Sequence, residues 1–404
     1  MSRRGPLQGV RILDLTSVLM GPYATQVFAD MGAEVIKIES PQGDTSRFVG
    51  PAKTRGKAAI FANLNRGKKG VVIDLARPEG RDIALQLATR VDVVIHSMRL
   101  QAIQKLGLDY GEIFKVNPRV IYANLYGYGR AGPYAPKSAY DDTIQAMSGM
   151  AMLQAHINPE PQYVTTVLGD KVTALTAAYA ILAALFHRER SGEGQEIEVP
   201  MFETMASFLL VEHIAGAAFD PPLGPPVYTR AVTPDRRPYR TRDGYVSVLV
   251  YNDKQWQRFA ALSGHPEYAS DPRFATQSAR STHMAEFCQL VSQIIEERTT
   301  GEWLEALDRA GIPVARLNST EDLLTDPHLQ AVGFFRSIDD PVDGPVRLPG
   351  PPVHFSKTPA GFERPAPSLG QDTIEVLTGL GMDRSTIDDL ARRGVVRCPD
   401  SEAR

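Results

Sequence analysis

An aspartate at the start of a long apolar segment is the residue of this chain whose setting best suits chemistry. Gly169 and Asp170 lead directly into a run whose apolar side chains repeat at helical spacing. A carboxylate in that place can act as a nucleophile that forms a covalent intermediate. It can also be an N-cap, because an aspartate before a helix accepts backbone N–H bonds and suits the helix dipole. Taken alone, the position favours the cap.

Cationic residues stand close to several expected strand ends, where they could hold an anion such as a phosphate. Lys68 belongs to a short cationic segment ahead of one strand. Ser97, Met98 and Arg99 follow another strand, and Lys105 comes a helical turn or two later. Ligands of open α/β folds tend to bind near strand ends. Each cluster could equally be ordinary solvated surface.

Two further kinds of site are not supported by the sequence. Cys288 and Cys398 lie far apart without metal-ligand spacing, so we expect neither a disulfide framework nor a metal site. The first turn between strand and helix, residues 15–22, lacks the G-x-G-x-x-G spacing of dinucleotide-binding folds. A simple nicotinamide-dependent oxidoreductase is therefore disfavoured.

The composition is that of a globular protein with a large core. Of 404 residues, 43% are hydrophobic and 23% charged, which allows two or three domains. The net charge of −3 argues against nucleic acid as a partner, because such domains are strongly basic. No secretory leader and no run of 18 apolar residues occurs, so we expect a cytoplasmic protein without a membrane span.

The elements that would position these residues alternate between strand and helix. Near-continuous apolar strands of this kind predict a parallel sheet covered on both faces, so the fold class is α/β with a Rossmann-like large domain. The predicted strands are residues 10–15, 34–39, 70–75, 91–96, 119–124 and 196–199. The predicted helices of this part are residues 21–31, a helix from Pro78, short helices near Gln101 and Tyr110, and residues 170–190 and 202–217.

Two proline-rich segments suggest domain boundaries. Residues 221–226 read as a linker, after which a hairpin over residues 238–250 and helices near Lys254, Met284 and Thr300 predict a smaller α+β domain. A second proline- and glycine-rich stretch, residues 340–352, is predicted to be loop, followed by helices over 371–380 and 384–393. The predicted division is a large domain at 1–220, a small domain at 221–340, and a segment at 341–404 that returns to the large domain.

Ten short motifs occur in an order that identifies a family. They are residues 6–14, Gly21-Pro22, residues 32–39, Leu64-Asn65 with Lys68-Lys69, residues 106–108, residues 117–119, residues 127–129, Ala139-Tyr140-Asp141, Gly169-Asp170 and residues 191–195. This ordered set resembles the class III acyl-CoA transferases (CaiB/BaiF type), which include formyl-CoA transferase and carnitine CoA-transferase. The resemblance spans most of residues 6–205 and continues more loosely beyond.

The resemblance implies a fold, an assembly and a mechanism. The fold would be a Rossmann-like domain with a smaller domain in an interlocked homodimer. Asp170 matches the aspartate that attacks the thioester of the donor acyl-CoA, giving a mixed anhydride and then an aspartyl-CoA thioester. An acceptor carboxylate then attacks this thioester. The released thiolate finally takes the acceptor's acyl group from the second anhydride, which gives the new acyl-CoA. No metal or permanently bound cofactor is implied, and coenzyme A enters as part of the substrate.

The resemblance also implies binding residues. Lys68 matches a basic residue near the nucleotide end of CoA, and Lys105 with Leu106 matches an Arg-Met pair near its adenine and phosphates. Ser97 and Met98 stand where the formyl enzyme has an Asn-Phe pair.

The acyl pocket is implied in the same way. Leu19 replaces a glutamine of the formyl enzyme, so a different acyl or acceptor pocket is expected. Tyr140 and Asp141 match a Tyr-Glu pair beside the nucleophile, although Tyr140 could equally be a half-buried core aromatic residue.

Two alternatives to the transferase remain open. One is a racemase of α-methylacyl-CoA esters, which needs two bases at the α-carbon. The related racemases carry histidine where this chain has Tyr140, so racemisation is disfavoured. The other is a catalytically silent CoA-binding subunit. The acceptor is not specified, but arginines between positions 230 and 242 (Arg230, Arg236, Arg237, Arg240 and Arg242) could meet the second carboxylate of a dicarboxylic acid or simply face solvent.

Overall fold

The computed structural model describes residues 5–399, which form two compact units. The first unit contains the described residues up to Ser148, then Val164–Phe208, then the described residues from Gln330 onward. The second unit contains Gly149–Tyr163 and Leu209–Leu329. The chain thus leaves the first unit twice and returns to it twice. The longer excursion, Leu209–Leu329, begins and ends before the predicted boundaries 220/221 and 340/341.

The first unit is built on a seven-stranded sheet in the order β12-β3-β2-β1-β4-β5-β6. Every neighbouring pair is parallel except β12 and β3. This order reverses between β1 and β4, as in doubly wound nucleotide-binding folds. The α/β prediction is confirmed. The strands are β1 (Arg11–Leu15), β2 (Glu34–Glu39), β3 (Lys69–Ile73), β4 (Val93–His96), β5 (Ile121–Tyr126), β6 (Gln195–Pro200) and β12 (Val396–Arg397).

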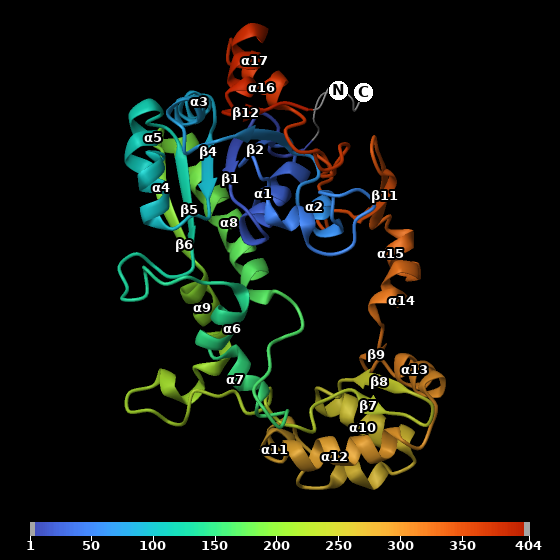
Figure 1. Cartoon of the computed structure of the whole chain (residues 1–404). Coiled ribbons are helices and arrows are strands. Elements are labelled where there is room, and N and C mark those ends of the chain that lie inside the picture. Colours follow the sequence, from blue (N-terminus) through green and yellow to red (C-terminus); the bar gives the residue numbers. More distant parts are fainter. Residues whose placement is uncertain (1–4, 400–404) are drawn as a thin grey trace. The chain divides into compact units, whose positions relative to one another are not determined.

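Helices cover both faces of this sheet. One cluster of buried side chains joins the sheet to α3, α4, α5, α16 and α17, and Figure 1 shows α3, α4 and α5 together on one side with α8 on the other. The helices of this unit are α1 (Met20–Asp30), α2 (Ala59–Leu64), α3 (Pro78–Ala88), α4 (Leu100–Leu106), α5 (Tyr110–Val116), α6 (Asp141–Met147), α8 (Leu168–Ser191), α16 (Thr373–Gly379) and α17 (Arg384–Arg392), with the 3-10 turn η1 (Thr45–Phe48).

Helix α8 is the longest element and carries Asp170 in its first turn. By length and hydropathy it is the one helix within the described residues that could cross a membrane. It contacts α1, β5 and β6, however, and buries small residues such as Ala174, Ala177 and Ala178 against them. Packing in the core accounts for its apolar character, because a buried helix needs the same composition.

The second unit has its own core around a small antiparallel sheet, β7-β8-β9. Arg240 pairs with Tyr245 across the Asp243-Gly244 turn, which confirms the predicted hairpin. Trp256 and Trp303 are fully buried in this core. Its elements are α7 (Met150–Gln154), η2 (Ala215–Ala218), β7 (Tyr239–Arg240), β8 (Tyr245–Val248), α10 (Asp253–Ser263), η3 (Pro266–Ser270), α11 (Gln277–Thr282), α12 (Met284–Ile295), α13 (Thr300–Arg309), β9 (Val314–Arg316) and α14 (Thr320–Thr325).

Two helices cross the boundaries between the units, α9 (Met201–His213) and α15 (Pro327–Ala331). After α15, the prediction of a loop over residues 340–352 is wrong in part. Strands β10 (Phe335–Asp340) and β11 (Gly344–Pro349) form an antiparallel hairpin there. Prolines at positions 345 and 349 hid the strand, since proline is usually excluded from sheets except at edges, and this two-stranded ribbon is all edge.

Candidate functional site

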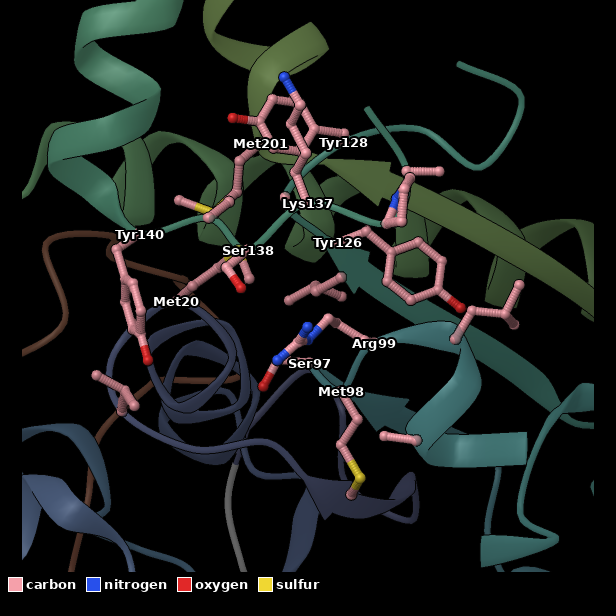
Figure 2. A pocket seen from close by; sticks show the side chains of 18 of the residues that line it. Met20, Ser97, Met98, Arg99, Tyr126, Tyr128, Lys137, Ser138, Tyr140 and Met201 are labelled. Atoms are coloured by element: carbon pink, nitrogen blue, oxygen red, sulfur yellow. The ribbon is translucent and has the colours of Figure 1, made fainter. Parts of the chain in front are cut away.

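A hollow of about 630 Å³ opens where the strand order of the large sheet reverses. Its walls come from the residues that follow β1, β4 and β5, which is the place where ligands of open α/β sheets bind. Leu19, Ser97, Met98, Tyr140 and Asp170 all line it. We call this hollow the site hollow. Figure 2 shows its labelled side chains. Ser97, Met98 and Arg99, which follow β4, face the segment that carries Lys137, Ser138 and Tyr140.

Asp170 is the third residue of α8, so the interpretation as an N-cap is wrong. The helix begins two residues earlier, and its N-cap position is Val167, which has no side-chain cap. Within residues 5–399, no hydrogen bond reaches the Asp170 carboxylate, which instead borders the site hollow. The position in the first turn still places it at the positive end of the helix dipole, which favours negative charge there.

Asp141, the first residue of α6, holds the start of α8 in place. Its Oδ1 accepts a hydrogen bond from the Asp170 backbone N–H at 3.0 Å, and its Oδ2 accepts one from Gln145 Nε2 at 2.6 Å. Gly169 allows this close approach, because a Cβ there would lie 3.1 Å from Asp141 Oδ1. Asp141 is therefore adjacent to the nucleophile candidate but does not line the hollow itself.

The Asp170 carboxyl has an unusual acidity. Burial, and then the nearby negative charge of Asp141, raise its pKa from 3.8 to about 7. Both causes disfavour the ionised form. Near neutral pH the group is therefore poised between carboxylic acid and carboxylate, and perturbed groups of this kind cluster at functional sites.

The turn after β1 is held by a buried acid. Val18 adopts a φ of 70°, which is costly for a β-branched residue, and its backbone N–H donates to both oxygens of Asp44 at 3.2 Å. Lys37 Nζ donates to Asp44 Oδ2 and to the Thr16 carbonyl, each at 2.9 Å. This network fixes the backbone that presents Leu19 to the hollow.

The turn after β4 is held by a buried histidine. His96 Nδ1 accepts a hydrogen bond from the Met98 backbone N–H at 3.2 Å, so its other ring nitrogen donates to Asn124 Oδ1 at 2.8 Å. Burial lowers the pKa of His96 to about 4, which keeps the ring neutral. The turn thereby directs Met98 and Arg99 toward the hollow.

Two cations of the site hollow have no acidic partner. No ion pair or hydrogen bond of the Arg99 or Lys137 side chain occurs in the part of the chain that the structure describes, and both residues are exposed. Lys137 Nζ lies 4.2 Å from the centre of the Tyr134 ring. Arg130 differs, because it pairs with Glu196 at 2.8 Å and with Glu198 at 2.7 Å. Arg99 and Lys137 are thus the cations available to an anionic ligand here.

Lys68 does not lie at the site, and its predicted contact with CoA needs correction. The side chain is fully buried, and its Nζ donates to Thr25 Oγ1 at 2.7 Å, Asn65 Oδ1 at 2.9 Å and the Pro22 carbonyl at 3.0 Å. It also pairs with buried Asp14 at 3.2 Å. These four acceptors leave it no free hydrogen for a ligand, so Lys68 is a structural ion-pair partner.

Lys105 and Leu106 border a second hollow of about 440 Å³. Its other lining residues include Arg77, Arg81 and Asp109, and none of them lines the hollow that holds Asp170. The predicted contact of Lys105 and Leu106 with CoA stays a prediction.

Several residues of the site were not singled out from the sequence. Tyr126 and Tyr128 line the hollow because β5 ends beside β4, and Lys137 and Ser138 reach it along the loop that follows. The Gly127-Tyr128-Gly129 motif signalled this loop. A Cβ on Gly127 would lie 2.2 Å from Ala139 Cβ, so the glycine lets the two ends of the loop close together.

The arrangement suits acyl chemistry on an anionic substrate. A carboxylate with raised pKa faces a partly apolar hollow, and two unpaired cations stand along its rim. Such a carboxylate can attack a carbonyl carbon, and the cations can hold phosphates. The other described residues of the hollow include no cysteine or histidine that could act as an alternative nucleophile.

Comparison with known proteins identifies relatives across the whole chain. The model of CoA-transferase family III matches residues 7–373. The chain is 35% identical over 395 residues to succinate–glutarate CoA-transferase of Agrobacterium fabrum, covering 94% of this chain and 96% of that protein. It is 31% identical over 404 residues to succinyl-CoA:glutarate CoA-transferase of Homo sapiens, covering 98% and 91%.

The fold also matches solved structures. A CaiB/BaiF family protein from Brucella suis superposes with a TM-score of 0.79 at 31% identity, covering 94% of this chain and 100% of that one.

Proposed function

The chain belongs to CoA-transferase family III, and we propose that it moves coenzyme A from an acyl-CoA to a carboxylic acid through covalent intermediates on Asp170. The observation that carries this proposal is the placement of the Asp170 carboxylate. It borders the hollow at the reversal point of the sheet and is not used to cap its own helix.

The reaction balances in four steps. The ionised carboxylate of Asp170 attacks the thioester carbonyl, which releases CoA thiolate and leaves a mixed anhydride. The thiolate attacks the aspartyl carbonyl, which releases the donor acid and leaves an aspartyl-CoA thioester. The acceptor carboxylate attacks that thioester and again releases the thiolate. The thiolate finally attacks the acyl carbon of the second anhydride, which yields the new acyl-CoA and restores the carboxylate.

Coenzyme A enters as part of the substrate in this proposal. Arg99 and Lys137 supply the positive charge that its phosphates need, since cations without an acidic partner can hold phosphate oxygens. Met98 supplies a polarizable thioether for the adenine. The reaction requires no resident metal or cofactor, because each step exchanges one carbonyl substituent for another.

We also propose that the protein is a homodimer. One face of α8 leaves large apolar side chains exposed: Leu175 is 49% exposed, Tyr179 64% and Phe186 63%. Leu175 and Tyr179 also line an apolar hollow of about 740 Å³ with residues near β11. Contiguous apolar surface of this kind marks an interaction site in soluble proteins.

A transfer assay tests the proposed function. The protein is mixed with succinyl-CoA or acetyl-CoA and a panel of carboxylic acids, and new thioesters are identified by mass spectrometry. Asp170→Asn should lose about 10³-fold or more of the transfer rate, because it removes the nucleophile. Asp142→Asn is the matched control, since Asp142 is an exposed neighbour on α6 outside the hollow. Wild-type transfer by Asp170→Asn would contradict the proposal.

A further inference from the structure

The turn between β1 and α1, residues 16–19, places a strained residue in the wall of the site hollow. We call it the Val18 turn. Val18 has a φ of 70°, and within residues 5–399 the only other non-glycine residue with a positive φ is Ala215. This left-handed conformation is unfavourable for a β-branched residue, because its Cβ comes too close to the following carbonyl oxygen. Such strain persists only where the surrounding structure holds it, and it clusters at functional sites.

Asp44 supplies the contact that holds this conformation. Its side chain is buried, and both of its carboxylate oxygens accept a hydrogen bond from the Val18 backbone N–H at 3.2 Å. Ser46 of η1 donates to Asp44 Oδ1 from its backbone N–H at 2.9 Å and from its hydroxyl at 2.8 Å. Lys37 of β2 donates to Asp44 Oδ2 and to the Thr16 carbonyl, each at 2.9 Å. The carboxylate thus joins the Val18 turn to β2 and η1.

The charges beneath the Val18 turn continue into a second buried ion pair. The Asp44 backbone N–H donates to Glu39 Oε2 at 2.9 Å, and Glu39 pairs with buried Arg47 at 2.6 Å. Burial acts to raise the pKa of Asp44, but Lys37 and the hydrogen bonds outweigh it and lower that pKa, so Asp44 is a carboxylate. Buried ion pairs add little net stability, because desolvation offsets their attraction. Strain at Val18 above such pairs therefore points to a role other than stability.

The Val18 turn places Leu19 beside the start of α8. Leu19 lines the site hollow together with Asp170, and it also lines the apolar hollow of about 740 Å³ together with Val167 and Lys171. Val167 is the N-cap position of α8, and Lys171 lies in its first turn. Leu19 therefore lies against the segment that carries the nucleophile candidate. A change in the conformation of Val18 would move this wall of the site hollow relative to Asp170.

We propose that Asp44 is a positioning residue for the transfer reaction: it holds Val18 in its left-handed conformation and so fixes Leu19 beside Asp170. Asp44 touches no substrate in this proposal, since it is buried and does not line the site hollow. The inference rests on the proposed function, because it concerns how the acyl group is placed for attack by Asp170. Small displacements of reacting groups are costly, so loss of the constraint should lower kcat more than it weakens binding.

A double-mutant cycle between Asp44 and Val18 tests the inference. Asp44→Asn replaces one acceptor oxygen by an NH2 group, which then faces the donors that surround the carboxylate. With the donor and acceptor that the wild type uses best, it should lower kcat about 10-fold or more, while KM for the donor changes less than about 3-fold. Glycine adopts a positive φ without strain, so Val18→Gly needs the anchor less. In the Val18→Gly background, Asp44→Asn should lower kcat less than about 3-fold.

The matched control is Asp340→Asn, which should keep the kcat of the wild type. Like Asp44, Asp340 is a buried acid that accepts hydrogen bonds from a lysine, Lys57, and from backbone N–H groups, but it does not line the site hollow. Thermal melting of every variant identifies losses that come from unfolding. Asp44→Glu keeps the charge beside Lys37 and moves the carboxylate, so it takes the place of Asp44→Asn in the cycle if that variant does not fold.

Three outcomes would overturn the inference while the proposed function stands. One is an equal loss of kcat on Asp44→Asn in both backgrounds, which would show that Asp44 does not act through Val18. The others are a wild-type kcat in Asp44→Asn, and a loss that is confined to KM. A wild-type protein that transfers CoA to no acid, by contrast, refutes the proposed function and the inference with it.

Discussion

At the scale of single residues, the acidity of Asp170 gives a prediction for pH dependence. Only the carboxylate form is a nucleophile, and its pKa is about 7. We therefore expect kcat/KM for transfer to rise with pH through neutrality and to level off about one unit above the pKa. Asp141→Asn removes the negative neighbour, so the midpoint should move to lower pH. A profile that is flat between pH 5 and 9 in the wild type would contradict the assignment.

The same shift predicts a change in stability. The pKa of Asp170 is higher in the folded state than in the unfolded chain, so the unfolded chain ionises at lower pH. The free energy of unfolding therefore decreases as the pH rises from about 4 to 7. Asp170→Asn removes this loss and should be more stable than wild type by roughly 4 kcal/mol at pH 8, with little difference at pH 4. Urea unfolding at the two pH values measures it. Equal stability of the two proteins at pH 8 would show that the carboxyl is not perturbed.

Lys68 and Asp14 form a buried pair whose role is structural. Burial acts to raise the pKa of Asp14, but Lys68 and Lys37 outweigh it and lower that pKa to about 2. Lys68→Met leaves Asp14 without its closest counter-charge and should cost about 3 kcal/mol or more of folding stability. KM for acyl-CoA of the folded fraction should not change. A rise in KM for acyl-CoA in Lys68→Met, with unchanged folding stability, would show instead that Lys68 contacts CoA.

At the scale of elements, the junction between α6 and α8 determines where the nucleophile lies. A Cβ at Gly169 would lie 3.1 Å from Asp141 Oδ1, so Gly169→Ala should push the two helix starts apart. We expect kcat to fall by about 10-fold or more, because small displacements of a reacting group are costly. The matched control is Gly301→Ala on α13, where nothing lies within 4 Å of the added Cβ. Unchanged kcat in Gly169→Ala would mean that this contact does not set the geometry.

The elements that the sequence predicts well are those with a strong local pattern. The parallel strands of the large sheet are short apolar runs, and the order of strand and helix limits how they can be connected. Hairpin β10–β11 and the two-residue strand β12 escaped prediction. Strand β12 is two residues long and pairs with the distant strand β3, so only the tertiary fold sets its partner. Strands β10 and β11 pair with each other, but the prolines of β11 interrupt the local pattern that would signal a strand.

The site was predicted in part for the same reason. Leu19, Ser97, Met98 and Tyr140 follow strands or motifs and do line the hollow with Asp170. Lys68 was misplaced because its buried partner Asp14 lies 54 residues earlier in the chain. Sequence spacing shows a cation beside a strand, but only the fold shows which way its side chain points.

At the scale of the whole molecule, the exposed face of α8 predicts an assembly. Tyr179→Glu places a charge among the apolar side chains of that face and should shift the protein from dimer to monomer in light scattering. Val116→Glu is the control, since Val116 is an exposed apolar residue at the end of α5. A wild-type protein that is monomeric at micromolar concentration would contradict the proposed homodimer.

The proposed mechanism depends on a covalent bond between Asp170 and coenzyme A, which mass spectrometry detects. The protein is incubated with an acyl-CoA donor, quenched, and measured intact and after digestion. We predict an added mass equal to coenzyme A less one water, located on the peptide that contains Asp170, absent in Asp170→Asn and present in Asp142→Asn. An adduct on any other residue, or none in a preparation that is transferring CoA, would contradict the proposed covalent mechanism.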